Sequence, residues 1–209
     1  MTIPTLTRRG YELDGTILPR VSTILATLAK PGLEAWRLKV GVEEAARISK
    51  TATELGTAIH AATEAWDRDA ELPADETLRA YVDGYRTWRA QHVAEVVSIE
   101  RIVWSPSLGY GGQLDRLYRM RDNRLLLGDI KSSKTVDGLY RAQLSAYALA
   151  LAECAGIHVD GRAVVHLPSD RPGVCRLVEY DDDAGDALTW RALVRVYQWW
   201  QAHADDWKA

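Results

Sequence analysis

The spacing of apolar residues divides the chain into a helical first part and a strand-rich second part. Apolar positions recur every three or four residues in Leu33–Ile48, Thr53–Asp69 and Asp75–His92, which predicts three helices. Before them, Asp14-Gly15 is a turn-favouring pair at the centre of a predicted short hairpin, and Ser22 is a suitable N-cap for a short helix.

After residue 93 the pattern changes to alternating and β-branched residues, which favour strands. The predicted elements of this part are strands at Ala94–Trp104, Gly112–Met120 and Arg124–Ile130, a helix at Asp137–Ala155, a hairpin of Arg162–Leu167 and Val174–Tyr180, and a helix at Asp183–Trp207. In the last helix the pair Trp199-Trp200 is predicted to pack on the body of the protein.

This order of elements predicts an α/β fold in which a mixed central sheet is flanked by helices, with a helical layer at the N-terminus. We expect one domain over residues 1–209. Its predicted parts are a mainly helical segment 1–92, a sheet core 93–181 and a closing helix 182–209.

Composition is typical of a globular protein, with 47% hydrophobic and 26% charged residues. The first ten residues contain no apolar signal segment, and no apolar run is long enough to cross a bilayer, so we expect an intracellular protein without a membrane partner. The chain has two cysteines, Cys154 and Cys175, without CxxC spacing. This excludes a thiolate metal site or an iron–sulfur cluster made by this chain alone.

Charge is unevenly distributed although the net charge is only −3. Residues 101–141 contain eight Lys or Arg against four Asp or Glu, whereas residues 142–209 contain six against ten. A basic segment around a few acids suits contact with phosphate, and a mixed solvated surface is the alternative explanation.

The candidate chemistry lies on two neighbouring predicted strands. Asp129 and Lys131 are two residues apart and therefore share one face, while Asp115 lies on the preceding strand. Carboxylates with few other ligands suit Mg²⁺ or Mn²⁺, and the Ile130 carbonyl could add an oxygen. Lys131 would then orient or deprotonate an attacking water. The alternative is a surface ion-pair cluster.

Two helices carry further candidates. His60 lies beside the predicted buried stripe of its helix, and Gly56 one turn earlier leaves room for an approaching group. Gln143 and Tyr147 are four residues apart on one helical face and need hydrogen-bond partners if buried. For Tyr147 the alternative is simple packing at the sheet edge.

A third group of residues is predicted to contact phosphate groups. These are Ser132, Ser133 and Lys134, which follow Lys131 in a loop, together with Arg116 and Arg141.

Four short motifs occur in order along the chain, and their combination is more specific than any one of them. They are Gly56-x-x-x-His60, Gly112-x-x-Asp115, Asp129-x-Lys131 and Gln143-x-x-x-Tyr147. This arrangement resembles the PD-(D/E)XK nuclease superfamily, in its RecB-like and phage-exonuclease branch, over roughly Thr53 to Tyr180. The proline of the superfamily name is absent, since Leu114 precedes Asp115.

The resemblance implies a restriction-endonuclease-like core and a divalent metal site of one or two Mg²⁺ or Mn²⁺ ions. His60 would join Asp115, Asp129 and the Ile130 carbonyl as a ligand, and its imidazole shifts the preference toward Mn²⁺. Lys131, Asp115, Asp129 and Gln143 would be the catalytic set. Gln143 would support the site or contact DNA, and Tyr147 beside it would be a further DNA contact, as would the phosphate-contact residues named above. A glutamate at the position of Glu100 would support the site rather than bind metal.

The expected activity is that of a metal-dependent DNA nuclease, most simply an exonuclease of recombination, repair or phage DNA processing. Its expected location is the cytoplasm of a bacterium or a phage-infected host, with DNA and an annealing protein or helicase as partners. The alternatives are a structure- or sequence-specific endonuclease of the same fold and a catalytically silent DNA-binding subunit.

Overall fold

The computed structural model describes residues 2–72 and 75–207, so residues 1, 73–74 and 208–209 of the predicted domain lie outside the described part. The helices are α1 (Val21–Leu25), α2 (Pro31–Val40), α3 (Val42–Asp67), α4 (Glu76–His92), α5 (Leu139–Ala155), α6 (Asp183–Ala202) and the 3-10 helix η1 (Ala204–Trp207). The strands are β1 (Thr5–Leu6), β2 (Tyr11–Leu13), β3 (Thr16–Leu18), β4 (Val93–Ser105), β5 (Tyr110–Met120), β6 (Leu125–Lys131), β7 (Gly161–His166) and β8 (Arg176–Tyr180).

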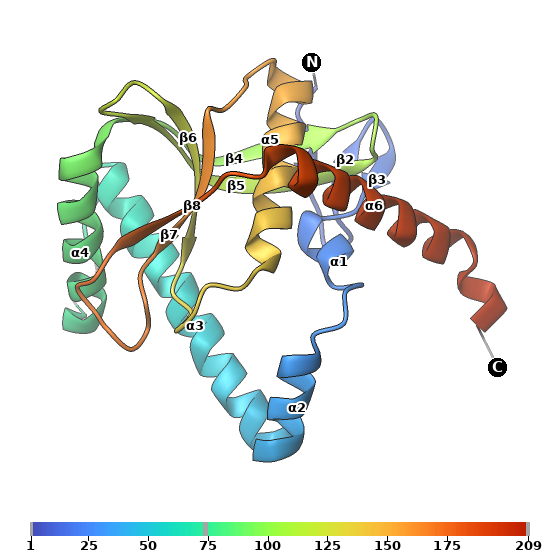
Figure 1. The fold of residues 1–209 in the computed structure, drawn as a ribbon, viewed down its shortest axis with the longest axis horizontal. Helices are drawn as coiled ribbons and strands as arrows, with labels where there is room; N and C mark the ends of the chain where they lie inside the picture. The colour runs from blue at the N-terminus through green and yellow to red at the C-terminus, as the bar shows by residue number, and fades with distance from the viewer. Residues whose placement is uncertain (1, 73–74, 208–209) are drawn as a thin grey trace.

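Five strands form the central sheet in the order β4-β5-β6-β7-β8 (Figure 1). Strands β6 and β7 are parallel and are joined through α5, while the other neighbours are antiparallel. A parallel pair needs such a crossover, and the helix in it covers one face of the sheet. The predicted α/β fold with a mixed sheet flanked by helices is therefore confirmed. Strands β1 to β3 form a separate small sheet.

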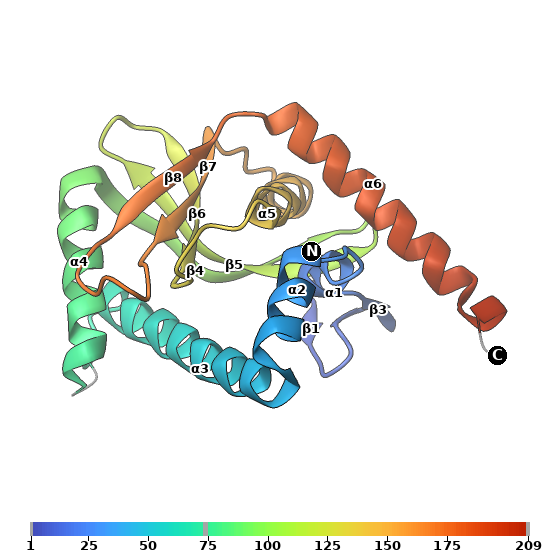
Figure 2. The same ribbon diagram turned by 60° about the horizontal axis from the view of Figure 1, so that its bottom comes forward.

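Helices cover both faces of the sheet (Figure 2), and each face has its own apolar core. Helices α3 and α4 cover one face, where Ile59 and Tyr85 pack with Tyr118 and Ile130 of the sheet. Helices α1, α5 and α6 cover the other face, around the fully buried Trp190. The sheet thus holds α3 and α5 on opposite sides of β6, which carries Asp129 and Lys131.

The boundary between the second and third helices was predicted wrongly. The chain breaks at Gly41, where φ is +89°, and α3 then runs without interruption from Val42 to Asp67. Glycine adopts this backbone conformation at little cost, whereas Ser49 to Ala52, the predicted break, contains neither glycine nor proline. His60 is therefore carried by one long helix.

The prediction that Trp199 and Trp200 pack on the body is also wrong. Their residues are 49% and 51% exposed, because the second half of α6 extends past the sheet (Figure 2). The buried contacts of α6 come instead from its first part and middle, including Trp190 and Leu193. Within the described part of the chain, no helix has the length and apolar character needed to cross a membrane.

Candidate metal centre

The site forms where β5 and β6 separate. Their pairing ends at Arg116 and Gly128, after which β5 continues along β4 and β6 continues along β7. The Asp115 carboxylate fills the space between them and its Oδ2 accepts a hydrogen bond of 2.7 Å from the Ile130 backbone N–H. Since the N–H and C=O of a strand residue point to the same neighbouring strand, the Ile130 carbonyl also faces this space.

Three possible metal ligands converge beside Asp115. One ligand atom each from His60, Glu100 and Asp115 lies within 4.8 Å of the others, and His60 Nδ1 is 3.5 Å from Asp115 Oδ2. Helix α3 turns Ile59 fully into the core and thereby holds His60 at the edge of the site. One imidazole and two carboxylates form a donor set that suits Mn²⁺ and accepts Mg²⁺. The residues present therefore fit a divalent cation.

Asp129, the other predicted carboxylate ligand, lies beside this group of three and not within it. Its buried carboxylate forms an ion pair with Lys131, and its Oδ1 accepts a hydrogen bond of 3.2 Å from Gln143 Nε2. Burial raises the pKa of Asp129 to about 6, although the Lys131 ammonium opposes this shift. Asp129 thus lies next to the ligands and faces the catalytic lysine candidate.

The Lys131 ammonium is affected by two carboxylates, those of Asp129 and Asp115. Burial lowers the pKa of its ammonium, but the Asp129 and Asp115 carboxylates outweigh burial and the resulting pKa lies above its ordinary value. The ammonium also lies close to the Tyr140 ring, whose centroid is 5.1 Å from Nζ. An ammonium in this position can orient a water and neutralise negative charge.

Gly112 and Tyr147, from two different motifs, are in contact. A Cβ atom on Gly112 would lie only 2.5 Å from the Tyr147 ring, so only glycine allows the ring to pack there. The Tyr147 hydroxyl accepts a hydrogen bond of 3.1 Å from Gln143 Nε2, the same group that donates to Asp129. Tyr147 is 8% exposed and supports Gln143, which is at odds with the predicted contact to DNA.

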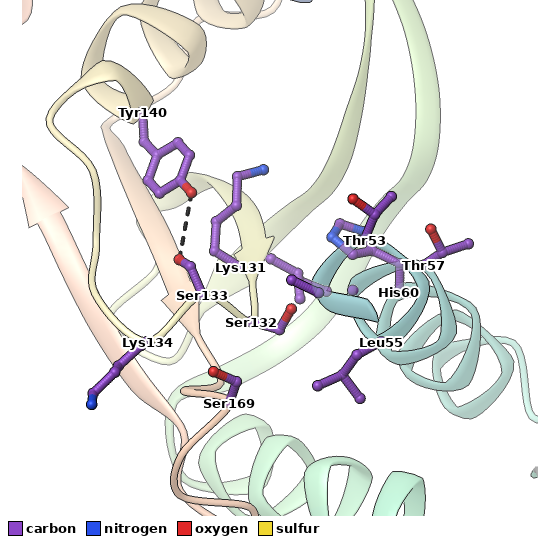
Figure 3. A pocket seen from close by; sticks show the side chains of 13 residues that line it. Thr53, Leu55, Thr57, His60, Lys131, Ser132, Ser133, Lys134, Tyr140 and Ser169 are labelled. Atoms are coloured by element: carbon purple, nitrogen blue, oxygen red, sulfur yellow. Dashed lines mark hydrogen bonds between the residues drawn. The ribbon is translucent and has the colours of Figure 1, made fainter. Parts of the chain in front are cut away.

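An open cavity of about 800 Å³ is lined by His60, Ile130 and Lys131. One wall is α3, with Thr53, Thr57 and His60, and the other is the loop after β6, with Ser132 and Ser133 (Figure 3). The walls approach closely at Gly56, where a Cβ atom would lie 3.3 Å from Ser132 Oγ. Lys134 is exposed at the outer end of this loop and also lines the cavity. The cavity thus places hydroxyl groups and the Lys134 ammonium on the same open space as His60 and Lys131.

Neither arginine of the predicted phosphate contacts lies in this cavity. Arg116 is fully buried and pairs with Asp67 and Glu100, so it cannot reach a phosphate on the surface. Arg141 pairs with Asp186 and stacks on Tyr180, which compensates its charge. The sequence predicted that both side chains contact phosphate, because the pattern of a strand or a helix does not reveal which acids will pair with them.

For two acids of this region, Glu100 and Asp67, the structure shows contacts that the sequence did not predict. Glu100 was expected only to support the site, yet it is one of the three converging ligands. Its φ of +49° is unusual for a residue other than glycine, and the pairing of β4 with β5 keeps the same register on both sides of it. Asp67 ends α3 with a side chain that is 0% exposed, although its position on the helix looks ordinary. No sequence signal distinguishes it.

No protein-family model and no curated protein sequence matches the chain. Among solved structures, the chain is similar to a candidate exonuclease from Eubacterium rectale, with a TM-score of 0.46 and 10% identity over 92% of this chain and 77% of that one. It is also similar to an alkaline exonuclease from Laribacter hongkongensis, with a TM-score of 0.34 and 14% identity over 66% and 78% of the two chains. Because these scores and identities are low, we infer function from the geometry of the site.

Proposed function

We propose that this protein is a metal-dependent DNA nuclease, acting as an exonuclease in DNA recombination, repair or phage DNA processing. The observation that carries this proposal is the convergence of His60, Glu100 and Asp115 beside the Asp129–Lys131 pair at an open cavity. The order of the four motifs supports the choice of a nuclease among phosphate-cleaving enzymes.

His60, Glu100 and Asp115 would hold the cation, with Asp129 and the Ile130 carbonyl next to them. A divalent cation bound there would act as a Lewis acid on water and on the phosphodiester. Lys131, as an ammonium, would stabilise the negative charge that develops on the phosphoryl oxygens in the transition state. The Gln143 amide donates a hydrogen bond to the Asp129 carboxylate and thereby helps to orient it toward Lys131, its ion-pair partner.

The DNA backbone would enter through the cavity. Ser132 and Ser133 supply hydroxyl donors, and Lys134 adds a charge at the outer end of the same loop. Such contacts position the strand without reading its sequence, which is what a degradative nuclease requires.

The first test is DNA degradation by the purified protein with Mn²⁺, Mg²⁺ or a chelator. We expect degradation of labelled linear DNA with either metal, faster with Mn²⁺ because an imidazole is among the ligands. We expect none with the chelator. Covalently closed circular DNA of the same sequence should remain intact, because an exonuclease needs an end.

Each other outcome selects an alternative. Cleavage of the closed circle would identify an endonuclease of the same fold. No degradation of either substrate, together with no heat of Mn²⁺ binding in calorimetry, would identify a catalytically silent DNA-binding subunit.

Lys134→Ala is expected to weaken DNA binding uniformly across sequences and to reduce the slope of log affinity against log salt by about 1, because one phosphate contact is lost. Fluorescence anisotropy over a salt series in the presence of Ca²⁺ would measure this. Arg124→Ala is the control, since Arg124 lies at the opposite end of β6 and pairs with Asp122 and Glu179. An unchanged salt slope in Lys134→Ala would remove this residue from the DNA contacts.

A further inference from the structure

Arg116 is a charged residue in the interior of the protein. Its side chain is 0% exposed, yet it lies on β5 immediately after Asp115. A buried guanidinium is costly unless carboxylates and other acceptors surround it. Its partners therefore indicate what it does for the neighbouring site.

The Arg116 guanidinium connects the end of α3 to the metal centre. Its Nε donates to Asp67 Oδ2 at 2.7 Å, and its Nη1 donates to Glu100 Oε1 at 3.1 Å. Nη1 also donates to the backbone carbonyl of Asp115 at 2.8 Å. One rigid planar group thus contacts two of the three residues that carry the converging ligands.

Glu100 needs such a partner. Its carboxylate lies beside that of Asp115, and burial followed by the Asp115 charge raises the pKa of Glu100, while Arg116 opposes the rise. Two like charges at close range repel each other, so the Glu100 side chain would turn away unless a cation held it. Among the described residues, Arg116 is the cation that hydrogen-bonds this carboxylate.

The position of Arg116 is in turn stabilised by Asp67, which has further partners on α4. The Asp67 side chain is 0% exposed and also accepts a hydrogen bond of 2.7 Å from the Tyr85 hydroxyl, while Arg89 lies 3.3 Å from its Oδ1. Tyr85 and Arg89 both belong to α4. The path from α4 through Asp67 and Arg116 to Glu100 is therefore continuous.

We propose that Arg116 is a positioning residue that fixes the Glu100 carboxylate beside His60 and Asp115 and thereby sets the affinity of the centre for a divalent cation. The proposal rests on the metal centre of the proposed function and adds that Asp67, remote from the ligands, acts on it through Arg116. Loss of a group that hydrogen-bonds a ligand typically weakens metal binding about 10- to 100-fold.

The decisive comparison is between Arg116→Lys and Arg162→Lys. Arg162 is a matched control, since it too is buried, pairs with two carboxylates (Asp183 and Asp186) and donates to a backbone carbonyl. Its partners do not include any of the three converging ligands. Calorimetric titration with Mn²⁺ alone should show a Kd raised at least about tenfold in Arg116→Lys and unchanged in Arg162→Lys. Equal Kd values for wild type and a folded Arg116→Lys would overturn the proposal.

Two further variants keep the test decisive if Arg116→Lys does not fold. Asp67→Asn leaves every ligand and Arg116 in place and should also raise the Mn²⁺ Kd, and an unchanged Kd would contradict the proposal. In a Glu100→Gln background, Asp67→Asn should cause no additional loss, because it acts through Glu100. A full additional loss there would show that Asp67 acts by another route.

These results are independent of catalysis. If the wild-type protein binds Mn²⁺ with the expected variant pattern but degrades no DNA, the proposed function fails and the role of Arg116 stands. If it degrades DNA while Arg116→Lys and Asp67→Asn leave the Mn²⁺ Kd unchanged, the role of Arg116 fails and the proposed function stands.

Discussion

Lys131→Ala is expected to lower DNA hydrolysis by at least about a hundredfold, because the variant lacks the ammonium that would stabilise transition-state charge. Asp129→Asn should give a comparable loss, since Asp129 holds Lys131 through the buried ion pair and lies next to the ligands. Initial rates on linear DNA with saturating Mn²⁺ would measure both effects. Full activity in either variant would contradict the proposed mechanism.

The same variants are expected to remain folded, and this can be checked separately. Without Lys131, the Asp129 carboxylate, whose side chain is 2% exposed, loses its counter-charge, so Lys131→Ala should melt at a lower temperature than wild type. Added Mn²⁺ should recover part of this loss, because a cation held by His60, Glu100 and Asp115 would bring positive charge next to the Asp129 carboxylate. Lys50→Ala is the control, since Lys50 is highly exposed and pairs only weakly with Glu54.

Gly112→Ala is expected to destabilise the protein by about 1–3 kcal/mol, since the new methyl group would lie 2.5 Å from the Tyr147 ring. Activity should fall as well, because a displaced Tyr147 no longer holds Gln143 against Asp129. Denaturant unfolding and DNA hydrolysis would measure the two effects. Gly138→Ala is the matched control, because nothing lies within 4 Å of a Cβ atom at that position.

A second substitution separates packing from positioning. Tyr147→Leu in the Gly112→Ala background removes the aromatic ring from the crowded space, so stability should partly return. Activity should stay low, because leucine offers no oxygen to the Gln143 amide. Recovery of both properties would show that Tyr147 acts through packing alone.

Much of the fold follows from local patterns. The alternation in β5 and the apolar periodicity of α4 predicted these elements within a few residues of their bounds, and the strand predicted at Arg124–Ile130 corresponds to β6. Gly156 ends α5 with a φ of +65°, as a glycine after a helix commonly does. The break at Gly41 was missed because the apolar pattern continues through both neighbouring helices.

Local patterns also predicted part of the candidate site. Asp115, Asp129 and Lys131 belong to neighbouring strands, and the structure brings them together with His60. Glu100 depends on an irregular backbone in β4, and Arg116 depends on acids from α3 and β4. Such features arise from contacts between residues distant in the sequence, which local periodicity does not encode.

The sequence by itself determined the order and type of most elements and the residues of the candidate centre that share a strand or a helix face, because these properties depend on neighbours along the chain. Only the tertiary structure decided which charges are buried and which partners they have. In it, Asp115 lies where β5 and β6 separate, the buried Arg116 donates to Glu100, and Lys131 pairs with Asp129. The physical reason is that burial and electrostatic pairing depend on the packing of the whole chain.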